Sequence, residues 1–358
     1  MVKGVERITL KKSAGKEELD KQNLPVFERA QKLALQYRGG MQSIREGGWT
    51  PDIIISHSAW GCGLYAKEIF PDSKFISYSE WWFKPNSQFF QYDPNNKDLG
   101  ISNRSIQKAW QRNQHMALEL ALADDIVSPT TWQRDQLPKI FRDNCKVIFD
   151  GVDESIFFMK SSPGKDNLKV TYGTRGMDPM RCFPQFIKTI PKFLKYKPEA
   201  TIEIAGRDES FYGPGKPTGS KFKSWKAWAC DYLEKNNVQN NVIWVGHMKL
   251  EQYVSWLKSS HCHVYLTHPF VPSWSLVEAY CVGAPIVTSD ILATREICET
   301  NKGVWYADHR ETEEIVDAII SCTDQAHSIT LAEQIKRRFL WRFSLGLAHE
   351  LWRRMWLV

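Results

Sequence analysis

The fold is decided by residues 261–290, which read HCHVYLTHPFVPSWSLVEAYCVGAPIVTSD. Apolar residues alternate at 262, 264 and 266, which is typical of a β-strand, and a loop with two prolines follows. Residues 275–281 then predict a short helix that ends at Gly283, and Pro285 opens a second strand over 286–288. Strand, loop, helix and strand in this order predict a βαβ unit. The N–H groups at the start of such a helix are unpaired and can bind phosphate.

The same alternation continues on both sides of this stretch. The first half predicts strands at 53–56, 74–78, 125–128 and 146–149, separated by helices at 63–70, 104–123 and 131–140. The second half predicts strands at 168–173, 201–205, 242–245 and 304–306 around the opening stretch, and a strongly amphipathic helix at 181–195. Alternating strands and helices predict parallel sheets with helices on both faces. The sequence SSPGKDN at 161–167 has the composition of a linker and places a domain boundary near residue 160.

Composition narrows the class of protein. A chain of 358 residues is long enough for two domains, and its formal net charge of +6 is too small to indicate nucleic-acid binding. The eight cysteines form no Cys-x-x-Cys pair, so we expect reduced thiols in a cytosolic protein. No apolar run approaches the roughly 18 residues that a membrane span requires, and MVKGVERITLKK at the start is not a signal peptide.

Three charged side chains lie around the predicted strand ends of the second half. Arg175 follows the strand at 168–173, and Arg181 opens the next helix. Because open α/β sheets bind ligands at the carboxyl ends of their strands, these guanidinium groups could converge on a diphosphate; the alternative is two surface arginines near a turn. Glu278, one turn into the helix at 275–281, could accept hydrogen bonds from a ribose diol, or could be a solvated glutamate that the helix dipole favours.

The histidines give weaker signals. His57 follows a buried strand at its carboxyl end and could hydrogen-bond a sugar hydroxyl or a phosphate oxygen, although a capping or core role fits as well. His261, Cys262 and His263 have the residue types of a metal site. On a strand, however, His261 and His263 share one face while Cys262 points away, and no third ligand is near in sequence. We therefore predict no metal site.

Together these motifs resemble the retaining glycosyltransferases of family 4. In chain order they are PDIIISH at 51–57 with Trp60-Gly61, SPT at 128–130 with Trp132-Gln133, DGVD at 150–153, RGMDPMR at 175–181, and residues 273–290. The resemblance implies an α/β fold in the GT-B arrangement, with two Rossmann-like domains and a cleft between them. Residues 1–160 would form the acceptor-side domain, 161–335 the nucleotide-sugar-binding domain, and 336–358 a helix that crosses back to the first domain.

The resemblance also implies an activity and a set of site residues. The expected reaction moves a hexose from a UDP- or GDP-linked donor to a glycan or lipid-linked glycan, with retention of configuration and with neither metal nor another cofactor. The residues with an expected catalytic role are Arg175 and Arg181, which would hold the diphosphate, and His57, which would reach the donor sugar. The expected donor-binding positions are Glu278 at the ribose, Arg207 in the nucleotide pocket, and the backbone at Ser273, Trp274 and Ser275 beside the sugar and phosphate.

Two departures from the family pattern alter these expectations. The family usually has a glutamate that contacts the transferred sugar eight residues before the position of Glu278, and here that position is Phe270. Recognition of the sugar hydroxyls is therefore expected to differ. The usual N-terminal strand and Gly-rich loop do not occur before Pro51, so we expect a shortened first domain with an altered acceptor cleft. Trp81, Trp82 and their aromatic neighbours in the loop at 79–100 could compensate by stacking on an acceptor sugar, or could form a buried plug.

Other functions fit parts of the same pattern. The main alternative is a non-catalytic module that binds a nucleotide sugar or a partner enzyme, and a remote one is a sugar-nucleotide epimerase of the same fold. The basic, aromatic tail at 337–356 suits either packing within the chain or contact with an anionic membrane surface. We therefore expect a cytoplasmic protein, with peripheral contact to the inner face of the membrane as the alternative.

Overall fold

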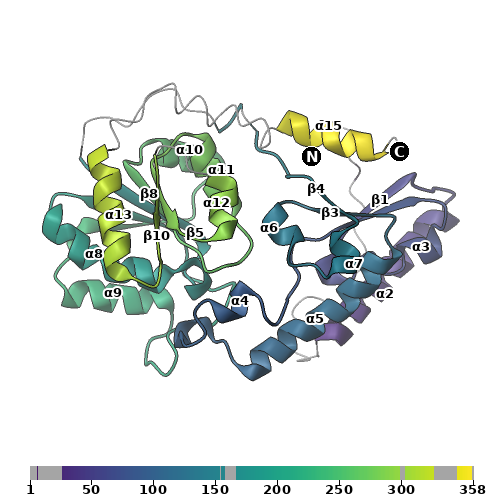
Figure 1. Ribbon diagram of the computed structural model, residues 1–358, viewed down its shortest axis with the longest axis horizontal. Helices are drawn as coiled ribbons and strands as arrows, with labels where there is room; N and C mark the ends of the chain where they lie inside the picture. Colours follow the sequence, from purple (N-terminus) through teal and green to yellow (C-terminus); the bar gives the residue numbers. More distant parts are fainter. Residues whose placement is uncertain are drawn as a thin grey trace. The chain divides into compact units, whose positions relative to one another are not determined.

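The computed structural model describes residues 26–153, 155–157, 167–298, 303–325 and 345–356, together with Glu6. The chain divides into two compact units (Figure 1). The first unit contains residues 1–87, 103–148 and 355–358, and the second contains residues 88–102 and 149–354. Each unit is an α/β structure built on its own parallel sheet.

The first unit has a four-stranded parallel sheet in the order β1-β2-β3-β4. Its strands are β1 (Ile53–His57), β2 (Lys74–Tyr78), β3 (Asp125–Ser128) and β4 (Cys145–Val147). Its helices include α2 (Val26–Glu46), α3 (Ala66–Ile69), α5 (Asn103–Leu122), α6 (Thr131–Arg134) and α7 (Lys139–Arg142). The helix predicted at 131–140 is thus two short helices, because Pro138 cannot continue a helix and is instead the N-cap of α7.

The aromatic loop after β2 supplies part of the core of the first unit. Trp81 and Trp82 are only 6% and 5% exposed, and Trp82 packs with Met116 and Leu120 of α5 and Ile126 of β3. Both tryptophans are therefore core residues, and of the two alternatives their burial supports the buried plug rather than stacking on an acceptor sugar. The apolar character of a ring large enough to fill a gap between helix and sheet explains their position.

The second unit has a six-stranded parallel sheet in the order β10-β9-β8-β5-β6-β7. Its strands are β5 (Lys169–Gly176), β6 (Thr201–Arg207), β7 (Val242–Gly246), β8 (Cys262–Tyr265), β9 (Ile286–Ser289) and β10 (Val304–Ala307). Helices α8 (Phe183–Tyr196), α9 (Trp225–Lys235) and α13 (Thr312–Gln325) cover one face, and α10 (Leu250–Lys258), α11 (Trp274–Cys281) and α12 (Leu292–Cys298) cover the other (Figure 1).

Successive strand residues in the second unit feed two separate cores. Val264 and Val287 pack on the face of α8, α9 and α13, whereas their neighbours Tyr265 and Ile286 pack on the face of α10, α11 and α12. This is the alternation that a strand buried on both faces requires. The βαβ unit predicted from residues 261–290 is present as β8, α11 and β9, so the opening stretch lies in the middle of the larger sheet.

Some expectations differ from the structure or fall outside the described residues. Strand β5 continues three residues beyond its predicted end at Gly173, and α12 was not predicted. The first 25 residues apart from Glu6, the linker and residues 326–344 are not described, so neither the expected shortening of the first domain nor the domain boundary is tested. At the end of the chain lies α15 (Leu345–Trp356), where Lys74 of β2 donates a hydrogen bond to the carbonyl of Met355.

The turn after β1 depends on a glycine. A Cβ atom at Gly63 would lie 2.6 Å from Phe75 Cζ, 2.8 Å from Glu119 Oε1 and 2.8 Å from Ser56 Cβ, closer than packed atoms tolerate. The replacement Gly63→Ala should therefore lower the free energy of unfolding by about 1–3 kcal/mol, as overpacking does. Urea denaturation measures this change.

A glycine in the same unit provides the control. Gly39 lies inside α2, and nothing lies within 4 Å of the Cβ that alanine would add. Gly39→Ala should raise the free energy of unfolding by about 0.5–1 kcal/mol, because alanine is the better helix former. Equal effects of the two substitutions would show that the turn around Gly63 is not tightly packed.

Candidate functional site

Arg181 is a buried arginine without an ion pair among the described residues. It is 8% exposed and ends the 3-10 helix η3 (Pro179–Arg181), just before α8. Its Nη1 lies 2.9 Å from the hydroxyl of Tyr265, 2.9 Å from Thr267 Oγ1 and 3.0 Å from the carbonyl oxygen of Val271. Its Nε and Nη2 have no partner in the described chain. One edge of a guanidinium is thus fixed by neutral oxygens, and its charge is left for an anion.

The hydroxyl of Tyr265 joins Arg181 to the start of α11. It accepts a hydrogen bond from Arg181 and another from the backbone N–H of Ser273, at 2.7 Å. Ser273 is the N-cap of α11, and its Oγ accepts from the backbone N–H of Ser275 at 3.4 Å. The N-terminus of α11 and the guanidinium of Arg181 therefore converge through one oxygen atom. Both carry positive charge, the first through the helix dipole.

Glu278 lies one turn into α11 and is partly buried. Its Oε2 accepts a hydrogen bond from the hydroxyl of Tyr253 at 3.0 Å, while its Oε1 has no partner in the described part of the chain. Burial raises the pKa of the Glu278 carboxyl above its usual range, and the hydrogen bond from Tyr253 partly opposes this. The arrangement leaves one carboxylate oxygen for a hydroxyl donor.

Arg175 and Arg207 lie at the carboxyl ends of the adjacent strands β5 and β6, and both side chains are exposed. The pairing of these strands shifts register between Gly173 and Gly176, so Arg175 lies on a bulge. The guanidinium of Arg175 lies over the ring of Phe211, 4.1 Å from its centroid. A Cβ atom at Gly176 would lie 2.4 Å from the carbonyl oxygen of Glu209, so only glycine allows this loop to pass so close.

Asp178 is a buried carboxyl group that the sequence did not single out. It is 1% exposed, and its Oδ1 has no hydrogen-bond partner among the described residues. Burial raises its pKa to about 6, although the nearby charge of Arg181 and the backbone N–H groups of Phe211, Arg181 and Met180 lower it. Those N–H groups belong to η3 and to the loop after β6, so Asp178 ties together the segments that carry Arg181 and Phe211.

Comparison with known protein families identifies the family of this chain. The family described as glycosyl transferase family 4 group matches residues 1–157, and the one described as glycosyl transferases group 1 matches residues 154–338, more than half of the chain. The chain belongs to glycosyltransferase family 4. Members of this retaining family transfer a sugar from a nucleotide-sugar donor. No curated protein sequence matches the chain.

Solved structures confirm the fold of this glycosyltransferase. The sucrose-phosphate synthase of Thermosynechococcus elongatus matches 93% of the chain and 80% of its own length at 13% identity, with a TM-score of 0.68. HepE of Anabaena, with UDP and glucose bound, matches 93% and 84% at 16% identity, with a TM-score of 0.66. A glycosyltransferase of Rickettsia africae matches 96% and 87% at 14% identity, with a TM-score of 0.62. The predicted GT-B class with two parallel sheets is confirmed.

Aromatic rings surround the fixed guanidinium. The carbon Cζ of Arg181 lies 5.8 Å from the ring centroid of Tyr212 and 5.9 Å from that of Phe270. Phe270 packs on Tyr212 at 5.3 Å and on Phe89 at 5.4 Å between centroids. Phe89 comes from the aromatic loop in the first half of the sequence, where the prediction concerned an acceptor sugar and not the surroundings of Arg181. The sequence predicted Phe270 only as a departure from the family.

Phe89 belongs to a segment of the first half that is part of the second unit, residues 88–102. This segment contains α4 (Gln88–Gln91) and the 3-10 helix η2 (Lys97–Leu99), and η2 packs against the helix η3 that ends in Arg181. The backbone carbonyl of Phe89 accepts a hydrogen bond from His268 Nε2 at 2.7 Å. The 88–102 segment therefore lies against the elements that support Arg181.

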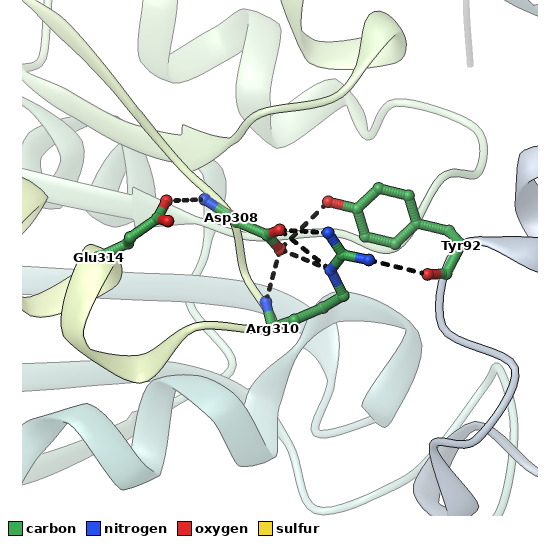
Figure 2. Close-up of polar contacts among 4 residues, drawn as sticks. All are labelled: Tyr92, Asp308, Arg310 and Glu314. Carbon is green, nitrogen blue, oxygen red and sulfur yellow. Dashed lines mark hydrogen bonds and ion pairs between the residues drawn. The ribbon is translucent and has the colours of Figure 1, made fainter.

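A polar cluster holds the 88–102 segment in place (Figure 2). The hydroxyl of Tyr92 donates to Asp308 Oδ1 at 3.2 Å, and Arg310 donates from Nη1 to the carbonyl of Tyr92 at 3.2 Å. Arg310 also pairs with Asp308 and stacks over the Tyr92 ring, 4.3 Å from its centroid. Glu314 accepts from the backbone N–H of Asp308 at 3.0 Å. Burial alone would raise the pKa of Asp308, but the hydrogen bonds from Arg310 hold it at about 2.

His57, the remaining predicted site residue, lies in the first unit at the end of β1. Its Nδ1 accepts a hydrogen bond from the backbone N–H of Ala59 at 3.2 Å, and its Nε2 lies 3.2 Å from Glu80 Oε2. The backbone of Ser273, Trp274 and Ser275 forms the first turn of α11, and the Trp274 side chain is 45% exposed. The contacts of these four residues do not test the roles predicted for them.

The described residues contain no group of three or more histidine, cysteine, aspartate or glutamate side chains that could hold a metal ion. His261 Nδ1 instead accepts from the backbone N–H of Lys169 at 3.2 Å, and His263 Nδ1 lies 2.8 Å from Thr171 Oγ1. Both histidines thus tie neighbouring strands together. Among the described helices, none is both long and apolar enough to cross a membrane.

The second prediction concerns the polar cluster. Arg310→Met removes the hydrogen bonds to Asp308 and Tyr92 and the cation–π contact. We expect amide hydrogen exchange of the 88–102 segment to become about tenfold faster, since such contacts contribute about 1–2 kcal/mol together. Mass spectrometry of exchange resolves this segment from α13.

The same unit offers a matched control for that variant. Arg295 also pairs with an aspartate, Asp290, and stacks on a tyrosine, 4.2 Å from the centroid of Tyr306. Arg295→Met should leave exchange in residues 88–102 unchanged. If both variants loosen that segment equally, the cluster around Tyr92 does not hold it.

The third prediction follows from the raised pKa of Asp178. Its native pKa of about 6 lies above the ordinary value near 3.9, so ionisation costs stability as the pH rises from about 4 to above 6. Asp178→Asn removes this cost. Relative to the wild type, the free energy of unfolding of the variant should therefore rise by about 1–3 kcal/mol between pH 4 and pH 7.

Denaturation curves at several pH values measure this difference. Asp124→Asn is the control of opposite sign, because Asp124 has a lowered pKa: partial burial raises it, but hydrogen bonds from Lys67 and from the backbone of Phe75 outweigh burial. Its variant should lose stability relative to the wild type as the pH rises. Parallel curves for the wild type and Asp178→Asn would contradict the assignment of a raised pKa.

Proposed function

We propose that this chain is a retaining hexosyltransferase that moves a hexose from a UDP- or GDP-linked donor to a glycan or lipid-linked glycan. The observation that carries the proposal is Arg181, a buried cation with no carboxylate partner in the described chain, joined through the Tyr265 hydroxyl to the N-terminus of α11. A diphosphate is the anion that suits both groups, because its oxygens can accept from a guanidinium and from helix N–H groups together.

The proposed reaction needs stabilisation of a leaving diphosphate. The bond between the anomeric carbon and the phosphate oxygen breaks, and its electron pair goes to the diphosphate. The acceptor hydroxyl attacks from the same face and its proton passes to the departing diphosphate oxygen, so the configuration is retained. Arg181 and Arg175 offset the developing charge, and each could contribute about 2–4 kcal/mol, as hydrogen-bond donors to developing oxyanions do. No metal takes part in this proposal.

The remaining residues would bind the donor. Glu278 would accept a hydroxyl of the ribose at its Oε1, and Arg207 would line the nucleotide pocket. The backbone at Ser273, Trp274 and Ser275 would touch the sugar and phosphate. For His57, contact with the transferred sugar stays a prediction. The UDP bound to HepE supports UDP as the first nucleotide to test.

The fourth prediction tests the role of Arg181. Arg181→Lys keeps a positive charge but loses the planar fork, so it should lower turnover about 100-fold and weaken UDP binding about tenfold. Calorimetry with UDP measures binding, and release of UDP from UDP-hexoses measures turnover. Arg175→Met tests whether the second cation contributes to turnover. Because Arg175 is exposed, this substitution does not disturb the core.

Arg134→Lys is the control, since Arg134 lies on the first unit and, among the described residues, forms an ion pair only with Asp135. It should leave both measurements unchanged. A folded Arg181→Lys variant with wild-type UDP affinity and turnover would overturn the proposal. Wild-type protein that binds UDP-hexoses but releases neither UDP nor a glycosylated product would favour the alternative, a nucleotide-sugar-binding module without catalysis.

A further inference from the structure

A second cluster of polar side chains lies at the carboxyl edge of the four-stranded sheet, in the first unit. His57 ends β1, Glu80 follows β2 by two residues, and Gln133 lies in α6 after β3. Because the strands are parallel, their carboxyl ends meet at one edge, where α/β sheets bind ligands. His57 Nε2 lies 3.2 Å from Glu80 Oε2, and the Gln133 amide donates to the backbone carbonyl of Glu80 at 2.7 Å. Glu80 is thus held at both its side chain and its backbone.

The histidine fixes the orientation of the carboxylate. The backbone N–H of Ala59 donates to His57 Nδ1, so the ring proton of the neutral histidine is assigned to Nε2, which donates to Glu80 Oε2. The carbonyl of Ala59 accepts from His115 Nε2 of α5 at 3.0 Å, so the turn itself is anchored. Glu80 Oε1 has no partner within the described residues, and the Glu80 side chain is 45% exposed. An oriented carboxylate therefore presents one free oxygen to solvent.

Trp60 provides a flat apolar surface beside this carboxylate. It lies in the 3-10 helix η1 (Ser58–Trp60) and is 59% exposed. One face of its indole stacks on the His57 ring, with 4.5 Å between centroids and 12° between planes. The contact holds the indole in one orientation while more than half of the side chain stays exposed. An exposed, rigid tryptophan is the kind of group that carries binding energy in recognition sites.

We propose that Trp60 and Glu80 form a subsite for a neutral pyranose, the terminal sugar of the acceptor. The C–H face of the ring lies on the indole of Trp60, and a ring hydroxyl donates to Glu80 Oε1. A carboxylate that accepts from hydroxyls repels a second anion, so the subsite selects neutral sugars over uronic acids and phosphorylated sugars. The inference rests on the proposed function, because it names the class of acceptor for that reaction.

Fluorine NMR of labelled tryptophans can test this proposal. Protein labelled with 5-fluorotryptophan gives separate fluorine NMR signals, and the signal that disappears in Trp60→Phe is that of Trp60. Titration uses the methyl glycosides of glucose, galactose, mannose and N-acetylglucosamine, and methyl glucuronide as the anionic probe. At least one neutral glycoside should shift the Trp60 signal in a saturable way, while methyl glucuronide should bind at least fivefold more weakly.

The variant Glu80→Gln separates recognition from folding. It should weaken binding of the neutral glycoside about fivefold to tenfold and remove the discrimination against methyl glucuronide, which loss of packing alone would not do. Trp110 is the internal control: it is 50% exposed in the same unit, and its signal should not move. The inference is overturned if no neutral glycoside shifts the Trp60 signal, if Trp110 shifts equally, or if Glu80→Gln leaves both affinities unchanged.

Calorimetry with UDP keeps the two proposals apart. UDP affinity should be the same in wild type, Glu80→Gln and Trp60→Phe, since neither residue belongs to the proposed donor site. If the wild type does not bind UDP, the proposed function is contradicted. Normal UDP binding with no effect of sugars at Trp60 would contradict only the acceptor subsite.

Discussion

One hydroxyl group organises the site in the second unit. The oxygen of Tyr265 accepts hydrogen bonds from Arg181 and from the backbone of Ser273, so it fixes a side chain from one loop against the start of a helix from another. Tyr265 ends β8 at the middle of the sheet, with its ring buried on the side of α11. The alternating side-chain directions of a buried strand place the Tyr265 ring on this face. Its hydroxyl then holds the two positive groups, the guanidinium of Arg181 and the N-terminus of α11. The rest of the site is arranged around that oxygen.

The energetics of Arg181 explain why the arrangement suits an anion. Burying a guanidinium is costly unless hydrogen bonds and opposite charge compensate for the lost water. Three neutral oxygens satisfy one nitrogen, and no carboxylate of the described chain forms an ion pair with Arg181, although its charge favours the ionised form of the buried Asp178. Positive charge is therefore incompletely compensated within the described chain. A dianionic ligand would supply the missing negative charge, so neutralising the buried guanidinium would itself favour binding.

The sequence predicted the architecture well because the hydrophobic pattern determines it. Buried runs and their breaks located most strands. Arg181 and Glu278 were singled out because they lie at a helix start or one turn into a helix, whereas Ser273 was proposed from the family resemblance. Tyr265 and Asp178 were missed, since a tyrosine at the end of an apolar strand and an aspartate in a turn look like ordinary core and loop residues. The contact of Phe89 with Phe270 could not be predicted, because the two residues are about 180 positions apart in the sequence. The structure was needed to show that Trp81 and Trp82 are buried, because the sequence around them does not show which aromatic side chains are exposed.

The path of the chain has a consequence for biosynthesis. Residues 88–102 dock on partners such as Asp308 and Arg310, which a ribosome adds more than 200 residues later. Until then the segment has none of those partners, and its aromatic side chains Phe89 and Tyr92 remain uncovered on the nascent chain. The second unit can therefore reach its final structure only after most of the polypeptide has emerged. Transiently exposed apolar surface of this kind is where chaperones bind and where aggregation begins.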